Sequence, residues 1–187
     1  MNTMELIYLY VHDDKKNIKD CEFNFSPKYK IHYEKSSRRL SLEIRDDLPL
    51  GWFGNNINNV TAIIGKNGTG KSNLIDCIIK ALCGQGGGLI IWSYEGKLYR
   101  NKQPFDINAT FPIKEHSIWG SPFSDIKHED RIPDTAVIYF SQNIDRKIKD
   151  NSMFHRFRDV STANLLRSNY YHLNNNKSQY FYDIDYM

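Results

Sequence analysis

Apolar and polar positions alternate in some stretches of the chain and are continuous in others, and the two patterns predict different elements. Residues 6–11 are apolar throughout and predict a buried strand. Residues 18–25, 30–33 and 40–44 place apolar side chains at alternate positions, which is typical of half-buried strands. The polar stretch between the last two favours an antiparallel hairpin. The N-terminal part of the chain is therefore predicted to be an antiparallel lobe.

A different pattern begins at Val60. Residues 60–64 form a short apolar run bounded by turn residues, as expected of a central parallel strand. From Ser72 to Cys83 apolar residues recur at helical spacing, and Gly84 predicts the end of that helix. Further along, the pattern predicts a hairpin (89–92 and 97–100), an irregular aromatic insertion outside the core layers (104–133) and another buried strand (136–140).

Between the predicted strand and helix the chain reads G-x-x-x-x-G-K-S, the phosphate-binding (Walker A) pattern. Its glycines allow successive backbone N–H groups to turn towards a phosphate. Lys71 is placed to reach the β- and γ-phosphates, and the Ser72 hydroxyl to ligate Mg²⁺. A chance loop of the same composition is the alternative. The predicted ATP-binding residues are Gly65, Lys66, Asn67, Gly68, Thr69, Gly70, Lys71, Ser72 and Asn73.

The stretch from Ile63 to Leu74 resembles the G-x-N-G-x-G-K-S-x-L loop of ABC, SMC and RecF-like ATPase heads. The Asn67-Gly68 pair favours these ATPase heads over the other P-loop proteins, namely kinases, GTPases and helicases. The run from Lys16 to Pro27 is similar to the N-terminal opening of RecF/SMC heads, and bacterial AAA-family, OLD-like proteins show insertions like residues 28–59 here. The resemblance implies an α/β P-loop NTPase fold, with a mostly parallel core sheet and an antiparallel N-terminal lobe. It also implies ATP and Mg²⁺ as cofactors, and self-association or a partner ATPase head.

A second match lies at residues 137–143, which resemble the strand and glutamine of a Q-loop. The resemblance implies that Gln142 is a catalytic residue and, with Ser72, a ligand of Mg²⁺. The alternative is a strand that ends in a solvated glutamine.

Two family features are missing from the sequence. No L-S-x-G signature follows Gln142, and no apolar strand ends in Asp-Glu. The nearest candidate, Tyr180 to Asp185, lacks that pair. We therefore expect an incomplete head, the N-terminal part of a larger ATPase, with ATPase activity only if a Walker B strand is supplied elsewhere. The expected layout is one ATP-binding domain: an antiparallel lobe with a hairpin insertion (1–59), a P-loop core with an insertion at about 93–134 (60–150), and the start of a helical region (151–187).

Composition and charge exclude only a few classes of binding partner. The 187 residues carry a net charge of +3, and the surplus lies around the glycine-rich loop, where residues 51–100 hold five basic and two acidic residues. Local positive charge of this kind suits a bound anion better than a long polyanion. No apolar run reaches the ~20 residues of a membrane helix. Three cysteines without CxxC spacing suggest reduced thiols in a cytoplasmic protein.

Two other functions remain open at this point. One is a non-catalytic nucleotide-binding or docking fragment that regulates a partner, and the other, disfavoured by the loop, is a P-loop phosphotransferase. A basic cluster with interleaved aromatic residues could touch nucleic acid or an effector protein, although a solvated face is the favoured interpretation; its members are Arg146, Lys147, Lys149, Phe154, Arg156, Phe157 and Arg158. Nothing in the sequence chooses among DNA repair, chromosome organisation and phage defence.

Overall fold

The computed structural model describes residues 4–46, 48–49, 52–54, 57, 59–82, 88–115, 137–140, 157–160 and 162. The chain divides into two compact units, residues 1–133 and residues 134–187, and each is described by itself. Within the described ranges, no helix has the length and apolar character needed to cross a membrane.

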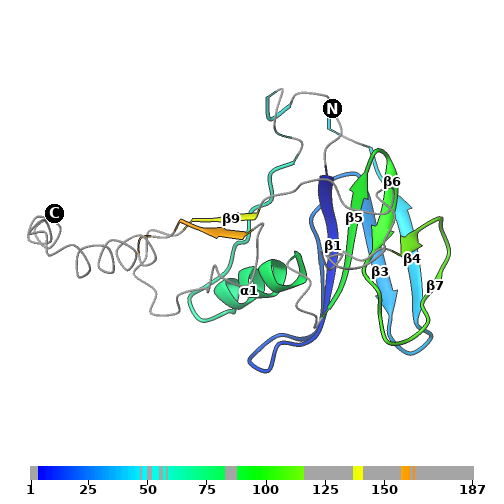
Figure 1. Ribbon diagram of the computed structural model, residues 1–187, viewed down its shortest axis with the longest axis horizontal. Coiled ribbons are helices and arrows are strands. Elements are labelled where there is room, and N and C mark those ends of the chain that lie inside the picture. The colour runs from blue at the N-terminus through cyan, green and yellow to red at the C-terminus, as the bar shows by residue number, and fades with distance from the viewer. Residues whose placement is uncertain are drawn as a thin grey trace, which may run out of the picture. The chain divides into compact units, whose positions relative to one another are not determined.

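The first unit contains eight strands and one helix among its described residues (Figure 1). They are β1 (Met4–Asp13), β2 (Lys19–Asn24), β3 (Tyr29–Glu34), β4 (Arg39–Ile44), α1 (Lys71–Leu82), β5 (Gly88–Tyr94), β6 (Lys97–Arg100), β7 (Asn108–Ala109) and β8 (Lys114–Glu115). In the second unit, β9 (Val137–Tyr139) pairs in parallel with β10 (Phe157–Asp159). The protein is thus of mixed α/β class, as predicted.

Two sheets form in the first unit. One has the order β2-β1-β5-β6-β8 and the other the order β3-β4-β7. The pairs β1–β2, β1–β5, β5–β6 and β3–β4 are antiparallel, and β3–β4 is in register from Tyr29 opposite Ile44 to Glu34 opposite Arg39. The antiparallel pairing of the N-terminal strands and the two predicted hairpins are confirmed, although β1 and β2 share their sheet with β5 and β6.

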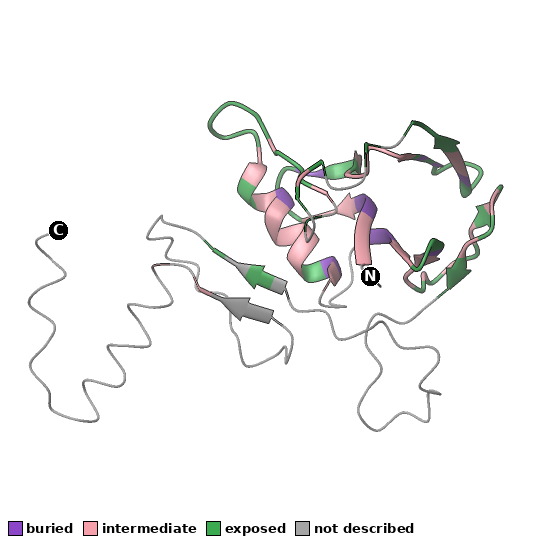
Figure 2. Ribbon diagram, turned by 90° about the horizontal axis from the view of Figure 1, so that it is seen from above, coloured by how far each residue is buried: buried purple, intermediate pink, exposed green. Residues whose placement is uncertain are grey.

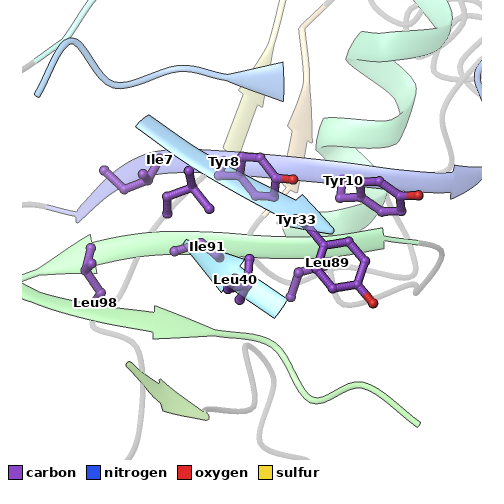
Figure 3. Packing of buried hydrophobic residues seen from close by; sticks show 9 residues of the cluster. Ile7, Tyr8, Tyr10, Tyr33, Leu40, Leu89, Ile91 and Leu98 are labelled. Atoms are coloured by element: carbon purple, nitrogen blue, oxygen red, sulfur yellow. The ribbon is translucent and has the colours of Figure 1, made fainter. Parts of the chain in front are cut away.

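The larger sheet is covered on both faces, which explains why β1 is continuously apolar instead of alternating. Tyr8 and Tyr10 of β1 pack with the β3–β4 hairpin in one cluster (Figure 3). Leu9 and Val11 point the other way, into a cluster that includes Leu74 and Ala81 of α1. Strand β5 divides its residues in the same manner: Leu89 and Ile91 join the first cluster, and Ile90 and Trp92 the second. Helix, sheet and second sheet therefore form three layers.

One irregularity in β1 departs from this alternation. The register between β1 and β5 shifts between Leu6 and Tyr8. Because a bulge adds one residue to a strand, it interrupts the alternation of side chains between the two faces. Ile7 and Tyr8 consequently both belong to the cluster shared with β3 and β4.

The prediction that residues 104–133 lie outside the core layers is wrong for their described part. Strands β7 and β8 pair in parallel with β4 and β6, respectively. Along residues 104–113, exposed and partly buried residues alternate. The partly buried aromatic and β-branched residues of this segment pack against the first cluster. They are Phe105, Ile107, Phe111 and Ile113. Residues 116–133 lie outside the described part.

The strand predicted over residues 60–64 is also not formed. This segment is an extended chain outside both sheets, and the exposed fractions of Val60 and Ile64 are 57% and 91%. Asn59 and Thr61 hold its start through side-chain bonds to the carbonyl of Phe25, at 2.8 and 3.1 Å. An apolar β-branched run favours a strand, but a strand also needs a neighbour that offers backbone partners. No mostly parallel sheet around residues 60–64 is present in the described part of the chain.

Candidate functional site

The predicted phosphate loop, residues 65–70, joins this extended segment to α1, and most of it is exposed (Figure 2). Two of its glycines have backbone angles in the left-handed region, with φ of 83° at Gly68 and 90° at Gly70. A third, Gly65, is close to a neighbour: a Cβ added there would lie 2.6 Å from Oγ1 of Thr69. The turn therefore requires glycine at these positions for two different steric reasons.

Hydrogen bonds within the loop close it into a compact turn. The carbonyl of Lys66 accepts from the backbone N–H of Thr69 at 3.3 Å and from the Thr69 hydroxyl at 2.8 Å. It also accepts from Nζ of Lys71 at 2.7 Å, and the carbonyl of Gly65 accepts from the same ammonium group at 2.6 Å. Lys71 thus folds back over the loop, where its charge is partly balanced by two carbonyl dipoles.

The start of α1 leaves a row of backbone donors open. The first N–H that bonds within the helix belongs to Leu74, which donates to the carbonyl of Gly70 at 2.8 Å. The N–H groups of residues 70–73 consequently have no acceptor inside the helix. Gly70 occupies the N-cap position, where a Ser or Asp side chain would normally accept one of these bonds. Open donors together with the positive end of the helix dipole favour a bound anion.

Ser72 is exposed on the first turn of α1, and its hydroxyl makes no hydrogen bond within the described part of the chain. A free hydroxyl oxygen is a suitable ligand for Mg²⁺, which keeps several waters and takes further oxygens from substrate phosphates. The described residues contain no group of three or more His, Cys, Asp or Glu that could hold a metal on its own. Ser72 therefore fits a metal that is bound jointly by the protein and a phosphate chain.

Two residues of the β1–β2 turn, which the sequence analysis did not assign to the site, contact its edge. Asn73 Nδ2 donates to Oδ1 of Asn17 at 2.6 Å, and Lys16 Nζ donates to Oδ1 of Asn73 at 3.1 Å. The Lys16 ammonium also lies 3.6 Å from a carboxylate oxygen of Asp76. A Cβ added to Gly70 would lie 2.6 Å from Nδ2 of Asn17. No local pattern could have revealed this contact, because 56 residues separate Asn17 from Asn73.

The turn itself is fixed by Asp14. Its Oδ1 accepts from the backbone N–H of Lys16 at 2.8 Å and from that of Ile18 at 2.9 Å. Desolvation opposes ionisation of this carboxyl, but the N–H donors of Ile18 and Lys16 outweigh it and lower its pKa. Asp14 therefore stays ionised near neutral pH and holds Lys16 and Asn17 next to α1.

The structure brings the predicted residues 65–73 together on one loop and one helix start. Gln142, the predicted Q-loop residue, lies outside the described residues, as do Cys83, Gly84 and the segment 180–185. The basic cluster is also outside them, apart from the short strand at its end.

Comparisons with known proteins give no family for this chain. No family model matches it, and neither a curated protein nor a solved structure is significantly similar.

Proposed function

We propose that the chain binds ATP with Mg²⁺ through residues 65–73, as the nucleotide-binding part of an ABC/SMC/RecF-like ATPase head. The observation that carries the proposal is the row of open N–H groups at residues 70–73, next to a lysine folded over the same loop. This arrangement supplies several donors and one positive charge to an anion of the size of a di- or triphosphate.

In the proposed complex, each group has a separate task. The open N–H groups bind phosphate oxygens, and Lys71 exchanges its two carbonyl acceptors for the β- and γ-phosphates. Ser72 would hold the metal through its hydroxyl oxygen, together with oxygens of the nucleotide. Bound Mg²⁺ would neutralise part of the phosphate charge. The exchange at Lys71 replaces neutral acceptors by charged ones, which makes stronger hydrogen bonds.

Calorimetric titration with ATP and Mg²⁺ tests the proposal. Replacing Lys71 by Ala removes a charge-assisted contact of about 1.5–3 kcal/mol, so affinity is expected to fall about ten- to a hundredfold. Lys80→Ala is the matched control, because Lys80 is an exposed lysine in the last turn of the same helix. Equal affinities of the wild type and Lys71→Ala would refute the assignment.

We further propose that this chain alone hydrolyses ATP very slowly. Turnover needs a carboxylate that completes the metal shell, a positioned water and a group that stabilises the transferring phosphate. The sequence contains neither an Asp-Glu pair after an apolar strand nor a signature segment. The loss of one such group commonly reduces turnover about 10²- to 10³-fold. Phosphate release at millimolar ATP measures this; turnover near once per second that Lys71→Ala abolishes would contradict it.

A further inference from the structure

Three side chains connect the β1–β2 turn to the phosphate loop. Lys16 donates to Asn73, and Asn73 donates to Asn17. Nδ2 of Asn17 then lies against the backbone of Gly70, 2.6 Å from where a Cβ on that glycine would be. The chain of hydrogen bonds thus begins at a cation and ends at Asn17, whose amide lies beside a glycine of the predicted nucleotide site.

The cation determines how both amides are turned. A lysine ammonium can only donate, so Asn73 has to present its oxygen to Lys16. The amino group of Asn73 is then the group that faces Asn17, and Asn17 has to accept with its own oxygen. The amino group of Asn17 is consequently turned away from Asn73, and it is the amide atom nearest to the Gly70 side chain position: a Cβ on Gly70 would lie 2.6 Å from Nδ2 and 3.1 Å from Oδ1.

The amino group of Asn17 has no acceptor within the described chain. Its oxygen is bonded to Asn73, and the residue is exposed, so the amino group is open to solvent. Gly70 contributes one of the open backbone N–H groups at the start of α1. An anion bound by that row of donors therefore has a further donor, already turned, at the edge of its site.

We propose that Asn17 is an additional nucleotide-binding residue, whose carboxamide N–H donates to a phosphate oxygen of the nucleotide. Lys16 and Asn73 are positioning residues: they do not contact the ligand in this scheme, and they fix the direction of the Asn17 amide. The inference rests on the proposed function, because the phosphate oxygen belongs to the nucleotide proposed for residues 65–73. It extends the site to a residue on a different layer of the fold.

Asn17→Asp separates this role from a purely structural one. The aspartate keeps an oxygen that accepts from Asn73, so the contact between the β1–β2 turn and α1 is retained. It replaces the amino group by a negatively charged oxygen, which repels phosphate. We expect the affinity for ATP to fall about tenfold or more, with no change in the midpoint of urea unfolding. Asn17→Ala, which removes the donor without adding charge, is expected to lower affinity by about threefold.

The control is Asn108→Asp, which introduces the same charge at an exposed position on β7 of the other sheet. Titrations use ATP and inorganic tripolyphosphate, each with Mg²⁺, and we expect Asn17→Asp to weaken both ligands equally. Weakening of ATP alone would place the contact on the sugar or base and overturn the phosphate assignment. If Asn17→Asp binds as well as Asn108→Asp while Lys71→Ala loses affinity, Asn17 is not a ligand and the proposed function stands. A wild-type chain that binds neither ligand overturns both proposals.

Discussion

The three-layer core and the segment that enters the phosphate loop have similar apolar residues but opposite surroundings. Ile90 and Trp92 of β5 are fully buried, with 0% exposure, whereas Val60 and Ile64 are 57% and 91% exposed. The backbone of β5 is paired on both sides by β1 and β6. Residues 60–64 have no strand neighbour in the described part of the chain; the side chains of Asn59 and Thr61 bond to the carbonyl of Phe25, and Ile63 packs against the cluster under α1.

The buried strands are therefore held in place by apolar packing, whereas the exposed loop is accessible to a ligand. Apolar burial contributes about 25 cal/mol per Å², so β1 and β5 acquire stability from both of their faces. The loop after residue 64 is held by hydrogen bonds within the turn and by the packing of Asn17 against Gly70. We infer that substitutions in the layers change folding stability, whereas substitutions in the loop change ligand affinity.

The largest expected effect on stability is at Trp92. Its side chain is fully buried and stacks on Tyr99, with ring centroids 6.1 Å apart. Trp92→Ala is expected to lower the free energy of unfolding by about 3–5 kcal/mol, because a large cavity remains. Trp52→Ala is the matched control: its side chain is 66% exposed, and we expect a change within about 0.5 kcal/mol. Urea unfolding followed by circular dichroism measures both, and similar values for the two variants would contradict the comparison.

A substitution at Gly70 is expected to change the free energy of unfolding less than Trp92→Ala does, but to weaken ATP binding strongly. Gly70→Ala puts a side chain at a φ of 90° and displaces Asn17, and we expect about 1 kcal/mol of lost stability and about tenfold weaker ATP binding. Gly54→Ala is strained at a similar φ of 99° but meets no neighbouring atom. It should share the loss of stability and keep full affinity. Weaker binding by the Gly54 variant as well would show that affinity merely follows stability.

The smallest effect is expected at Glu22, on strand β2 at the edge of the larger sheet. Partial burial disfavours its ionised form, but bonds from the His32 ring, the Tyr33 N–H and the Tyr8 hydroxyl outweigh this and lower its pKa. A depressed pKa in the folded state gives stability that is present above the ordinary carboxyl pKa of about 4.3 and is lost as the pH falls through the folded value.

Glu22→Gln should therefore lower the free energy of unfolding at neutral pH. The variant should also lose less of this free energy than the wild type when the pH falls. Because Glu22 is 38% exposed, solvent screening limits the expected loss to below about 1 kcal/mol. Glu34→Gln, on an exposed glutamate at the end of β3, is the control. Urea unfolding between pH 7 and pH 3 is the measurement, and an unchanged acid dependence in Glu22→Gln would refute the assignment.

The predictable parts of the fold are those that local pattern determines. Alternating residues and polar turns predicted the β3–β4 and β5–β6 hairpins, and helical spacing predicted α1, which starts one residue earlier than expected. Strands β7 and β8 are two residues long, which is too short for any periodicity to show. The apolar run 60–64 has strand propensity, but pairing depends on distant residues.

The same division applies to the site. Residues 65–72 follow a local motif whose spacing is itself the chemical requirement, so they could be chosen from sequence. The contact of Lys16 and Asn17 with Asn73 is made by the fold, across more than 50 residues of chain. Asp14, which fixes that turn through two backbone N–H groups, has no sequence signature beyond an acidic residue in a turn.

Amide hydrogen exchange with and without saturating ATP and Mg²⁺ tests the central claim most directly, because it reports on the backbone donors themselves. If residues 65–73 hold the nucleotide, their amides should exchange more slowly when ATP is bound, and those of β3 and β4 should be unchanged. Exchange at residues 65–73 that is the same with and without ATP would contradict the account. Protection confined to any other segment would contradict it equally.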